Sequence, residues 1–283
     1  MADILYGAPV AEAIAEGLTA RAAKLRTQGI EPCLAVLRVG AQDDHRSYES
    51  AIFRRCDQIG IRVMPVLLPA ECTQTALTSE IEKINADPRI HGCIMFRPLP
   101  RHLDEQAAAA VLTPRKDVDC MTPLSLLTVF TGRGEGFAPC TAQSCMELLD
   151  YYGIDPAGKR VAVIGRSLVV GEPVSIMLQA RNGTVTMCHS KTVDLPGVCR
   201  QADILIVAAG RAGMVDAGFA NPDQVVVDVG INITPDGGMC GDVLFEEVEP
   251  LVKAISPVPG GIGKVTTVVL CKHLIEAAEK TTE

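Results

Sequence analysis

The sequence predicts an α/β protein of two domains with a parallel sheet. Strand-like and helix-like segments alternate along most of the chain, and 283 residues with 48% hydrophobic content can form a sizeable core. An apolar run at 161–164 ends at Gly165, Gly171 follows six residues later, and 174–179 is helix-like. This pattern is typical of a buried strand, a tight turn and a helix N-terminus that holds a pyrophosphate on backbone N–H groups. The spacing is not G-x-G-x-x-G, so an ordinary turn without a ligand stays an alternative.

The first half of the chain alternates between the two periodicities. Apolar spacing and breaker residues predict helices at 8–27, 45–59, 75–87 and 104–112, and strands at 33–39, 61–68 and 92–96. Gly40 ends the first strand, Gly60 suits the C′ position of the second helix, and Pro88 ends the third. The stretch 116–141 has little periodicity and much Gly and Pro, which predicts a cleft-lining loop region with a short helix.

The second half repeats the alternation with more apolar strands. A helix is expected at 142–152, strands at 160–164, 184–188, 204–208 and 225–229, and a final helix at 265–280. Repeated strand–helix units indicate a parallel sheet with both faces covered.

Composition argues against several classes of protein. A net charge of −8 and the absence of Trp disfavour nucleic-acid binding. No apolar run is long enough for a membrane span, and no basic segment precedes an apolar run at the N-terminus. We therefore expect a cytoplasmic protein without nucleic-acid or membrane partners.

Eleven cysteines are scattered without a C-x-x-C pair or a Cys/His cluster at zinc spacing. We expect most of them to be small buried residues in a reducing compartment, with no disulfide framework and no metal site. Cys140, in the predicted cleft loop, is the one whose reactivity merits a test.

The residues near the glycine turn favour NADP over NAD. NAD sites usually have Asp or Glu about 20 residues past the turn, whereas here the second strand is followed by Ser190 and Lys191. Arg166 and Ser167 lie on the turn itself, and cations and hydroxyls suit a 2′-phosphate. The alternative is that Lys191 is only a solvated surface charge.

Several motifs, taken together and in order, resemble one family. They are Tyr48, Lys116-Asp117-Val118-Asp119, Pro139-Cys140-Thr141, Gly165-Arg166-Ser167, Val170-Gly171-Glu172-Pro173, His189-Ser190-Lys191-Thr192, Asp228-Val229-Gly230-Ile231-Asn232, Gly241-Asp242-Val243 and Pro257-Val258-Pro259-Gly260-Gly261. The chain resembles, nearly end to end, the methylenetetrahydrofolate dehydrogenase/cyclohydrolase family, whose members are bifunctional folate enzymes.

The resemblance implies two α/β domains with a cleft between them, usually in a homodimer. It assigns 1–141 and the C-terminal helix 265–283 to a folate-binding catalytic domain, and 142–264 to a Rossmann-like NADP-binding domain. In this family, hydride passes from 5,10-methylenetetrahydrofolate to C4 of the nicotinamide. The 5,10-methenyl product is then hydrolysed to 10-formyltetrahydrofolate.

The resemblance also implies the site residues. The cofactor would be held by Gly165, Arg166, Ser167, Gly171, Ser190 and Ile231. The folate would be held by Tyr48, Asp119, Pro259, Gly260 and Gly261. Tyr48 and Asp119 would also take part in catalysis. Asp119 suits a pterin because a carboxylate accepts the pterin's N–H donors. Without the family, Asp119 is a loop carboxylate, Tyr48 a helix-face aromatic and the glycine pair a turn.

The chain departs from the family where that family has polar catalytic groups. Ile52 stands where a lysine follows the tyrosine by four residues, and Phe96 stands where the family has glutamine. Lys264 replaces the proline after the glycine turn, and His45 stands where serine is frequent. Hydride transfer depends on positioning, but hydrolysis needs an activated water and proton transfers. Since Ile52 and Phe96 can neither donate nor accept a proton, the cyclohydrolase is expected to be weak or absent.

Four functions are compatible with these residues. The favoured one is an NADP-dependent methylenetetrahydrofolate dehydrogenase with little or no cyclohydrolase. A second retains both activities, with Lys264, Arg97 or His45 replacing the lysine and Lys264 the first candidate. A third is a non-catalytic paralogue that binds nucleotide. The fourth acts on a different pterin, because Phe96 and Arg97 alter the pocket wall.

Overall fold

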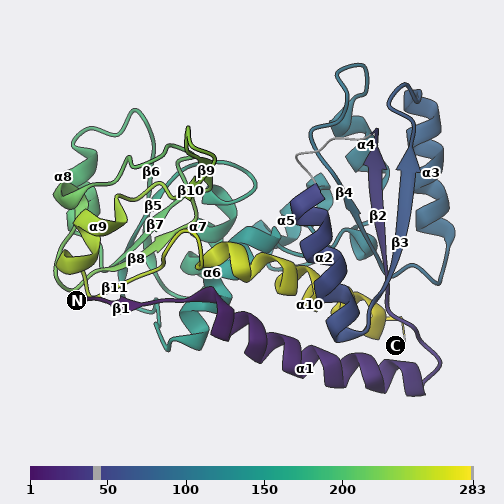
Figure 1. Cartoon of the computed structure of the whole chain (residues 1–283), viewed down its shortest axis with the longest axis horizontal. Helices are drawn as coiled ribbons and strands as arrows, with labels where there is room; N and C mark the ends of the chain where they lie inside the picture. The colour runs from purple at the N-terminus through teal and green to yellow at the C-terminus, as the bar shows by residue number, and fades with distance from the viewer. Residues whose placement is uncertain (41–45, 282–283) are drawn as a thin grey trace. The chain divides into compact units, whose positions relative to one another are not determined.

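The computed structural model describes residues 1–40 and 46–281, which divide into two compact units (Figure 1). One unit comprises 13–140 and 267–283, and the other comprises 1–12 and 141–266. The predicted ranges placed 1–12 in the first of these, whereas β1 (Asp3–Ile4) pairs with β11 (Ala254–Ile255) in the second. Within the described part of the chain, no helix is long and apolar enough to cross a membrane.

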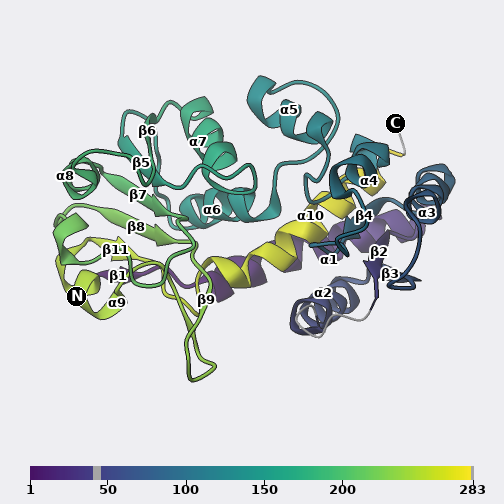
Figure 2. The same cartoon turned by 90° about the horizontal axis from the view of Figure 1, so that it is seen from above.

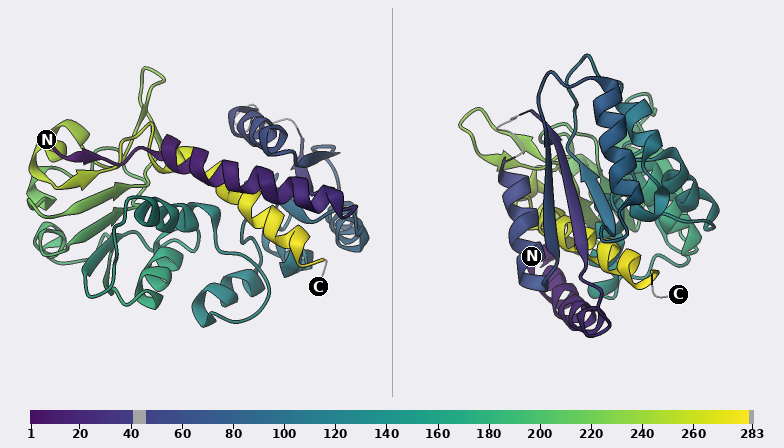
Figure 3. Two further views of the ribbon diagram at one scale, coloured as in Figure 1. Left: turned by 90° about the horizontal axis from the view of Figure 1, so that it is seen from below. Right: turned by 90° about the vertical axis from the view of Figure 1, so that its right-hand side faces the viewer.

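The unit of 13–140 and 267–283 contains a three-stranded parallel sheet of order β3-β2-β4. Its strands are β2 (Cys33–Val39), β3 (Arg62–Leu68) and β4 (Gly92–Met95). The helices α2 (Arg46–Ile59) and α3 (Gln74–Ala86) lie on opposite sides of these strands (Figures 1 and 3). The central strand β2 is buried along almost its whole length, as its continuous apolar run predicts.

Two long helices continue the core of this unit. Residues of α1 (Gly7–Thr27) lie beside α10 (Thr266–Glu279), and Arg21 forms a 2.6 Å ion pair with Glu279 (Figure 3). Ten residues of α10 are buried, which explains its nearly continuous apolar sequence. Shorter elements complete the unit: α4 (Glu105–Val111), the 3₁₀ turn Pro114–Lys116 and α5 (Pro123–Thr131).

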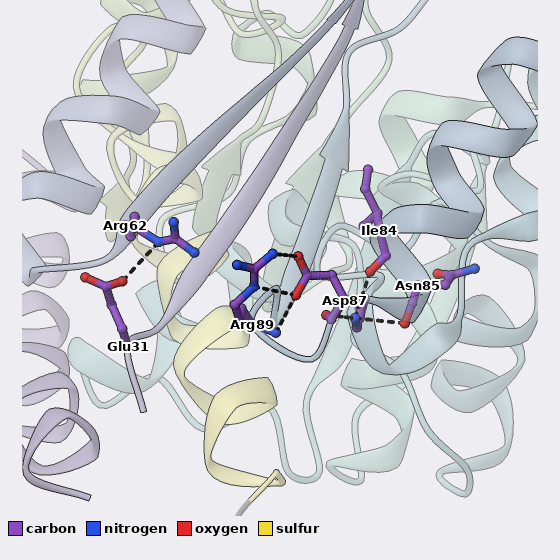
Figure 4. Close-up of polar contacts among 7 residues, drawn as sticks. Glu31, Arg62, Ile84, Asn85, Asp87 and Arg89 are labelled. Carbon is purple, nitrogen blue, oxygen red and sulfur yellow. Dashed lines mark hydrogen bonds and ion pairs between the residues drawn. The ribbon is translucent and has the colours of Figure 1, made fainter. Parts of the chain in front are cut away.

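The ammonium group of Lys116 binds the C-terminal end of α3. Its Nζ donates to the carbonyl oxygens of Ile84, Asn85 and Asp87 at 2.8, 3.0 and 2.7 Å (Figure 4). The last carbonyl groups of a helix have no intrahelical partner, and a cation there also interacts favourably with the helix dipole. Burial lowers the pKa of Lys116, while the charge of Asp87 opposes this change. Lys116 therefore connects the C-terminal end of α3 to the loop that contains residues 116–119.

The second unit contains a six-stranded parallel sheet of order β1-β11-β8-β7-β5-β6. Its longer strands are β5 (Arg160–Ile164), β6 (Thr184–Cys188), β7 (Ile204–Val207) and β8 (Val225–Asp228). Helices α6 (Cys140–Tyr151) and α7 (Gly171–Ala180) cover one face, and α8 (Leu195–Arg200) and α9 (Phe245–Val248) cover the other (Figures 1 and 2). The predicted parallel sheet with both faces covered is confirmed.

Several short elements were not predicted from the sequence. The strands β1 and β11 have two residues each, and β9 (Asn232–Ile233) and β10 (Met239–Cys240) form a small hairpin. Two residues are too few to show a period, so only pairing with a neighbouring strand defines such elements. Further 3₁₀ turns in the described residues are Ala217–Phe219, Glu249–Leu251 and Ile262–Lys264.

Two buried carboxylates hold the loops at the carboxyl ends of β7 and β8. Asp242 has no exposed surface and accepts hydrogen bonds of 2.7 to 2.9 Å. Its donors are the backbone N–H groups of Ala209, Gly210 and Arg211, and Nδ2 of Asn232. These bonds fix the 208–211 loop, which follows the strand next to the glycine turn.

Asp228 binds the same region from the end of β8. Its carboxylate accepts from the backbone N–H groups of Gly230, Asp242 and Val243 at 2.8, 3.2 and 3.0 Å. Burial nevertheless raises the pKa of Asp228 to about 6; the three hydrogen bonds lower it without offsetting the lost hydration, and the nearby negative charge of Asp242 adds to the rise. Asp228 is therefore ionised at neutral pH at a cost to stability.

We predict that Lys116→Met lowers the free energy of unfolding by about 2–4 kcal/mol, because three carbonyl groups lose a charged donor. Chemical denaturation at pH 7.5 measures the change. Lys83→Met is the matched control, since the Lys83 side chain is largely exposed and pairs with Glu80 at the surface; it should change the value by less than about 0.5 kcal/mol. Equal losses in the two variants would contradict the assigned role.

A second prediction concerns pH. The folded-state pKa of Asp228 is about 6 against an ordinary 3.8, so the folded state binds more protons between these values. The penalty for its ionisation is present above pH 6 and is lost as the pH falls toward 4. Relative to Asp228→Asn, the wild-type protein should gain about 2 kcal/mol between pH 7.5 and 4.5.

Asp203→Asn is a control in which the change of stability with pH should have the opposite sign. Hydrogen bonds from Arg160 lower the pKa of Asp203, so its contribution to stability is present at neutral pH and is lost on acidification. Unfolding curves of both variants at the two pH values are needed. A gap between wild type and Asp228→Asn that stays constant with pH would rule out the ionisation penalty.

Candidate functional site

The loop after the 3₁₀ turn Pro114–Lys116 is folded around a buried carboxylate. Asp117 has no exposed surface, and its oxygens accept from the N–H groups of Met121 and Thr122 at 2.8 and 2.7 Å. A parallel bridge between Asp117 and Cys93 places this loop beside β4. The chain makes a tight turn at Cys120, which has a φ of 56°. Asp117 therefore positions Asp119 rather than acting on a ligand itself.

Asp119 as a residue is half-buried, yet its carboxyl group is surrounded by protein and has little contact with water. Burial raises the pKa of Asp119, while a hydrogen bond from the Cys140 thiol and the charge of Arg97 lower it; the negative charge of Asp117 adds to the rise. A carboxylate held in this way can accept N–H donors of a ligand strongly if it is ionised.

The backbone just before Asp119 is held from α10. Nδ1 of His273 lies 2.9 Å from the carbonyl oxygen of Val118, and the Cys140 thiol lies 3.4 Å from the same oxygen. Because a carbonyl oxygen only accepts, Nδ1 of His273 carries the proton in this contact. The imidazole also stacks on Phe137 with ring centroids 4.9 Å apart.

These contacts give Cys140 a structural role. Its thiol is buried, and burial together with the charge of Asp119 raises its pKa well above the ordinary value. A thiol must ionise to react as a nucleophile, so the structure argues against reactivity at Cys140. All eleven cysteines are free thiols, and nine of them are buried, as the composition predicts for most of them.

We call Tyr48, its ring neighbour Phe96 and Ile52, one turn after Tyr48 on α2, the apolar wall of this unit. The Tyr48 ring packs edge-on against Phe96, with centroids 6.0 Å apart and an interplanar angle of 73°. Tyr48 is 38% exposed, whereas Ile52, one turn later on α2, is 0% exposed and Phe96 is 6% exposed. The pKa of Tyr48 is raised, first by desolvation of its hydroxyl and then by the charge of Asp119. Both positions predicted to lack a polar catalytic group are therefore buried and apolar.

The three candidate replacements for the missing lysine differ in their placement. His45 lies outside the described residues. Lys264 is exposed at the end of a 3₁₀ turn in the other unit. Arg97 directly follows Phe96, lies 3.7 Å from Glu105 in an ion pair, and its charge acts on Asp119. Lys264 was the first candidate in the sequence, and its role stays a prediction; Arg97 belongs to the unit that contains Asp119.

The predicted folate-side glycine turn is closely packed by its own chain. Gly260 has a φ of 114°, and its carbonyl oxygen accepts from the N–H of Gly7 at 2.8 Å. A Cβ at Gly7 would overlap the carbonyl oxygen of Gly261, and a Cβ at Gly261 would lie 2.6 Å from that of Pro257. The fold therefore requires glycine here, whether or not a ligand approaches. Pro259 is exposed between these residues.

The turn after β5 is so closely packed that two of its positions require glycine. Gly165 has a φ of 128°, and a Cβ there would overlap the carbonyl oxygen of Ala208. A Cβ at Gly171 would overlap the carbonyl oxygen of Gly165. The ten-residue helix α7 begins at Gly171 without a side-chain cap. The N–H of Glu172 donates to the carbonyl oxygen of Ser167 at 3.1 Å, and Pro173 has no N–H, so part of this helix end is already used by the turn itself.

The residues expected near a 2′-phosphate are exposed and carry no negative charge. Arg166 and Ser167 lie on the turn, and Ser190 and Lys191 follow β6. The carboxylate that comes next, Asp194, is the N-cap of α8 and accepts from the N–H of Gly197. Asp194 is therefore used locally, a role that sequence reasoning missed. Ile231, also predicted at the cofactor, is 59% exposed.

Comparison with known proteins accounts for both units. Residues 5–119 match the model of the tetrahydrofolate dehydrogenase/cyclohydrolase catalytic domain, and 139–282 match that family's NAD(P)-binding domain. The bifunctional protein FolD of Carboxydothermus hydrogenoformans is 49% identical over 281 residues, which cover 99% of this chain and 98% of that protein.

Two solved structures show the same fold along the full chain. The bifunctional enzyme FolD of Campylobacter jejuni has a TM-score of 0.96 and 36% identity, covering 99% of this chain and all of that one. The Trypanosoma brucei FolD enzyme, solved with NADP and an inhibitor, has a TM-score of 0.92 and 34% identity, covering 100% of this chain and 99% of that one. This chain belongs to the tetrahydrofolate dehydrogenase/cyclohydrolase family.

Proposed function

We propose that the chain is an NADP-dependent 5,10-methylenetetrahydrofolate dehydrogenase with weak or absent cyclohydrolase activity. The observation that carries this proposal is the apolar wall of Tyr48, Ile52 and Phe96. Ile52 has no exposed surface and Phe96 is 6% exposed, so neither position offers a proton donor, a proton acceptor or a place for a bound water.

The dehydrogenase step requires accurate placement but no proton transfer. A hydride leaves the methylene carbon, and the product is the 5,10-methenyl cation. Bound NADP supplies the C4 atom that accepts this hydride. In this proposal, Asp119 accepts N–H donors of the pterin, the Tyr48 ring lines the folate, and Gly165 and Gly171 allow the backbone to approach the pyrophosphate. Positioning of this kind is the main contribution a protein makes to hydride transfer.

The cyclohydrolase step has different requirements. Water must attack the methenyl carbon and lose a proton, and the ring nitrogen that leaves must gain one. General acid–base assistance is typically worth about 10²–10⁴-fold. Since Ile52 and Phe96 replace both polar groups that the family supplies, we expect the loss to be of this size.

Retention of both activities is the second candidate function, because relatives of this chain are named bifunctional proteins. In that case Lys264 or Arg97 would replace the missing lysine. We further propose tetrahydrofolate derivatives as the substrates, a homodimer as the assembly and the cytoplasm as its location. A catalytically silent protein would bind NADP without turnover, and one specific for another pterin would be inactive with methylenetetrahydrofolate.

The first test is a product assay with purified protein, 5,10-methylenetetrahydrofolate and NADP⁺, in which NADPH, the methenyl and the 10-formyl compounds are followed separately. We expect NADPH to form while methenyltetrahydrofolate accumulates and decays at the rate of an enzyme-free control. Accelerated formation of the 10-formyl compound would contradict the proposed loss. An absence of NADPH would contradict the dehydrogenase itself.

A second test restores the polar groups. The double variant Ile52→Lys/Phe96→Gln should accelerate methenyltetrahydrofolate hydrolysis about 10²-fold or more over wild type, because both family groups return together. Ile52→Lys alone should gain less, since a lysine at this fully buried position would lack the second polar group at 96. Ile52→Leu/Phe96→Leu is the apolar control, and hydrolysis by the double polar variant no faster than by this control would refute the assignment of the two positions.

Cofactor choice can be tested at the end of β6. Ser190→Asp places a carboxylate where the 2′-phosphate is expected and should lower kcat/KM for NADP by about 10-fold or more while NAD is less affected. Ser190→Asn controls for the size of the side chain. If NADP and NAD lose activity equally in Ser190→Asp, the 2′-phosphate does not bind there.

A further inference from the structure

The central strand β2 carries one charged side chain in its apolar run. Every residue of β2 is buried except Arg38, whose side chain is 21% exposed. The odd-numbered residues of 33–39 belong to a buried cluster that also contains residues of α3. Because side chains alternate between the two faces of a strand, Arg38 lies on the other face of the sheet. That face is the one on which α2 lies (Figures 1 and 3).

The helix α2 presents an acidic side chain to this face. Its buried residues Ile52, Cys56 and Ile59 follow helical spacing and form an apolar stripe. Glu49, in the first turn of α2, precedes Ile52 by three residues and lies on the same side of the helix. Its Oε2 accepts a hydrogen bond of 3.0 Å from Nη1 of Arg38, and its side chain is 18% exposed. The first turn of α2 therefore contacts β2 through a largely buried ion pair.

This ion pair is not the most favourable contact that the position allows. The Nε atom of Arg38 is buried and has no hydrogen-bond partner among the described residues, which is costly. Replacement of a buried ion pair by apolar side chains of similar volume is often neutral or stabilising. What the pair adds over an apolar contact is a defined register between α2 and β2, because it joins two particular atoms.

The position of Tyr48 depends on this register. Tyr48 directly precedes Glu49 on the helix, and its ring packs edge-on against Phe96, with centroids 6.0 Å apart. The N–H of Phe96 donates to the carbonyl oxygen of Leu37 at 3.0 Å, so Phe96 lies beside the residue that precedes Arg38. The ring contact and the ion pair thus join neighbouring residues of the helix to neighbouring points of the sheet. A shift of the first turn of α2 would change both.

We propose that Arg38 and Glu49 are positioning residues for Tyr48. Their ion pair fixes the first turn of α2 on the end of β2 and so holds the Tyr48 ring against Phe96, where it lines the folate. The inference rests on the proposed function, because that function assigns Tyr48 to the folate. Arg38 and Glu49 act through Tyr48 and take no part in hydride transfer.

The first test measures the position of Tyr48 without any ligand. The full-length protein is labelled with 3-fluorotyrosine, which gives signals for its four tyrosines in a fluorine NMR spectrum, and Tyr48→Phe identifies one of them. In Arg38→Met/Glu49→Leu the Tyr48 signal should move by more than its line width, while the signals of the other tyrosines stay in place. An unchanged Tyr48 signal would overturn the inference, whatever the protein binds.

The second test measures the affinity for tetrahydrofolate by anaerobic titration calorimetry. Arg38→Met/Glu49→Leu should bind about 10-fold more weakly than wild type, which is the size of a well-placed aromatic contact. In a Tyr48→Ala background the same two substitutions should cost less than about 2-fold, because their effect acts through the ring that is missing. Equal losses in the two backgrounds would overturn the inference. The absence of tetrahydrofolate binding by the wild-type protein would instead refute the proposed function.

Three further variants separate positioning from a general loss of stability. Glu49→Gln should retain the Tyr48 signal and the affinity, since its amide oxygen can still accept from Arg38. Glu49→Asp keeps the charge but shortens the side chain, so it should move the Tyr48 signal; it keeps the test decisive if the apolar variant does not fold. Arg62→Met/Glu31→Leu removes a 3.0 Å ion pair at the other end of the same sheet and should change neither readout (Figure 4). Equal changes in this control would overturn the inference.

Discussion

Buried carboxylates that accept backbone N–H groups are the constraint on which the other features of both units depend. Asp117 closes the loop that presents Asp119, and Asp228 and Asp242 close the loops at the carboxyl ends of β8 and β7. A buried carboxylate and a buried N–H are each costly when unpaired. Their pairing therefore leaves each loop one favourable conformation.

Periodicity was sufficient to predict most of the regular structure. The buried run at 33–39 and the alternation after residue 142 correspond to β2 and to the covered parallel sheet. Two-residue strands such as β1 and β11 could not be predicted, because their existence depends on a partner some 250 residues away in the chain. The grouping of residues 1–12 with 141–266 depends on the same pairing.

The candidate site was predictable in its residues but not in its environment. Counting four residues from Tyr48 locates Ile52, but only tertiary packing shows that the Phe96 ring lies against Tyr48. Cys140 appeared to be a loop thiol open to reaction, whereas its contacts with Val118 and Asp119 bury it. The glycines of the 257–261 turn were interpreted as space for a ligand, whereas a Cβ at Gly261 would already overlap the carbonyl oxygen of Pro257 in the same turn.

The apolar wall separates what the two reactions require. Ile52 and Phe96 are both buried, so a polar group at either position would have to find its hydrogen-bond partners inside the protein. Binding of the pterin can in this way be retained while the proton-transfer groups are lost, since the first needs only a fixed anion and the second needs groups that exchange protons.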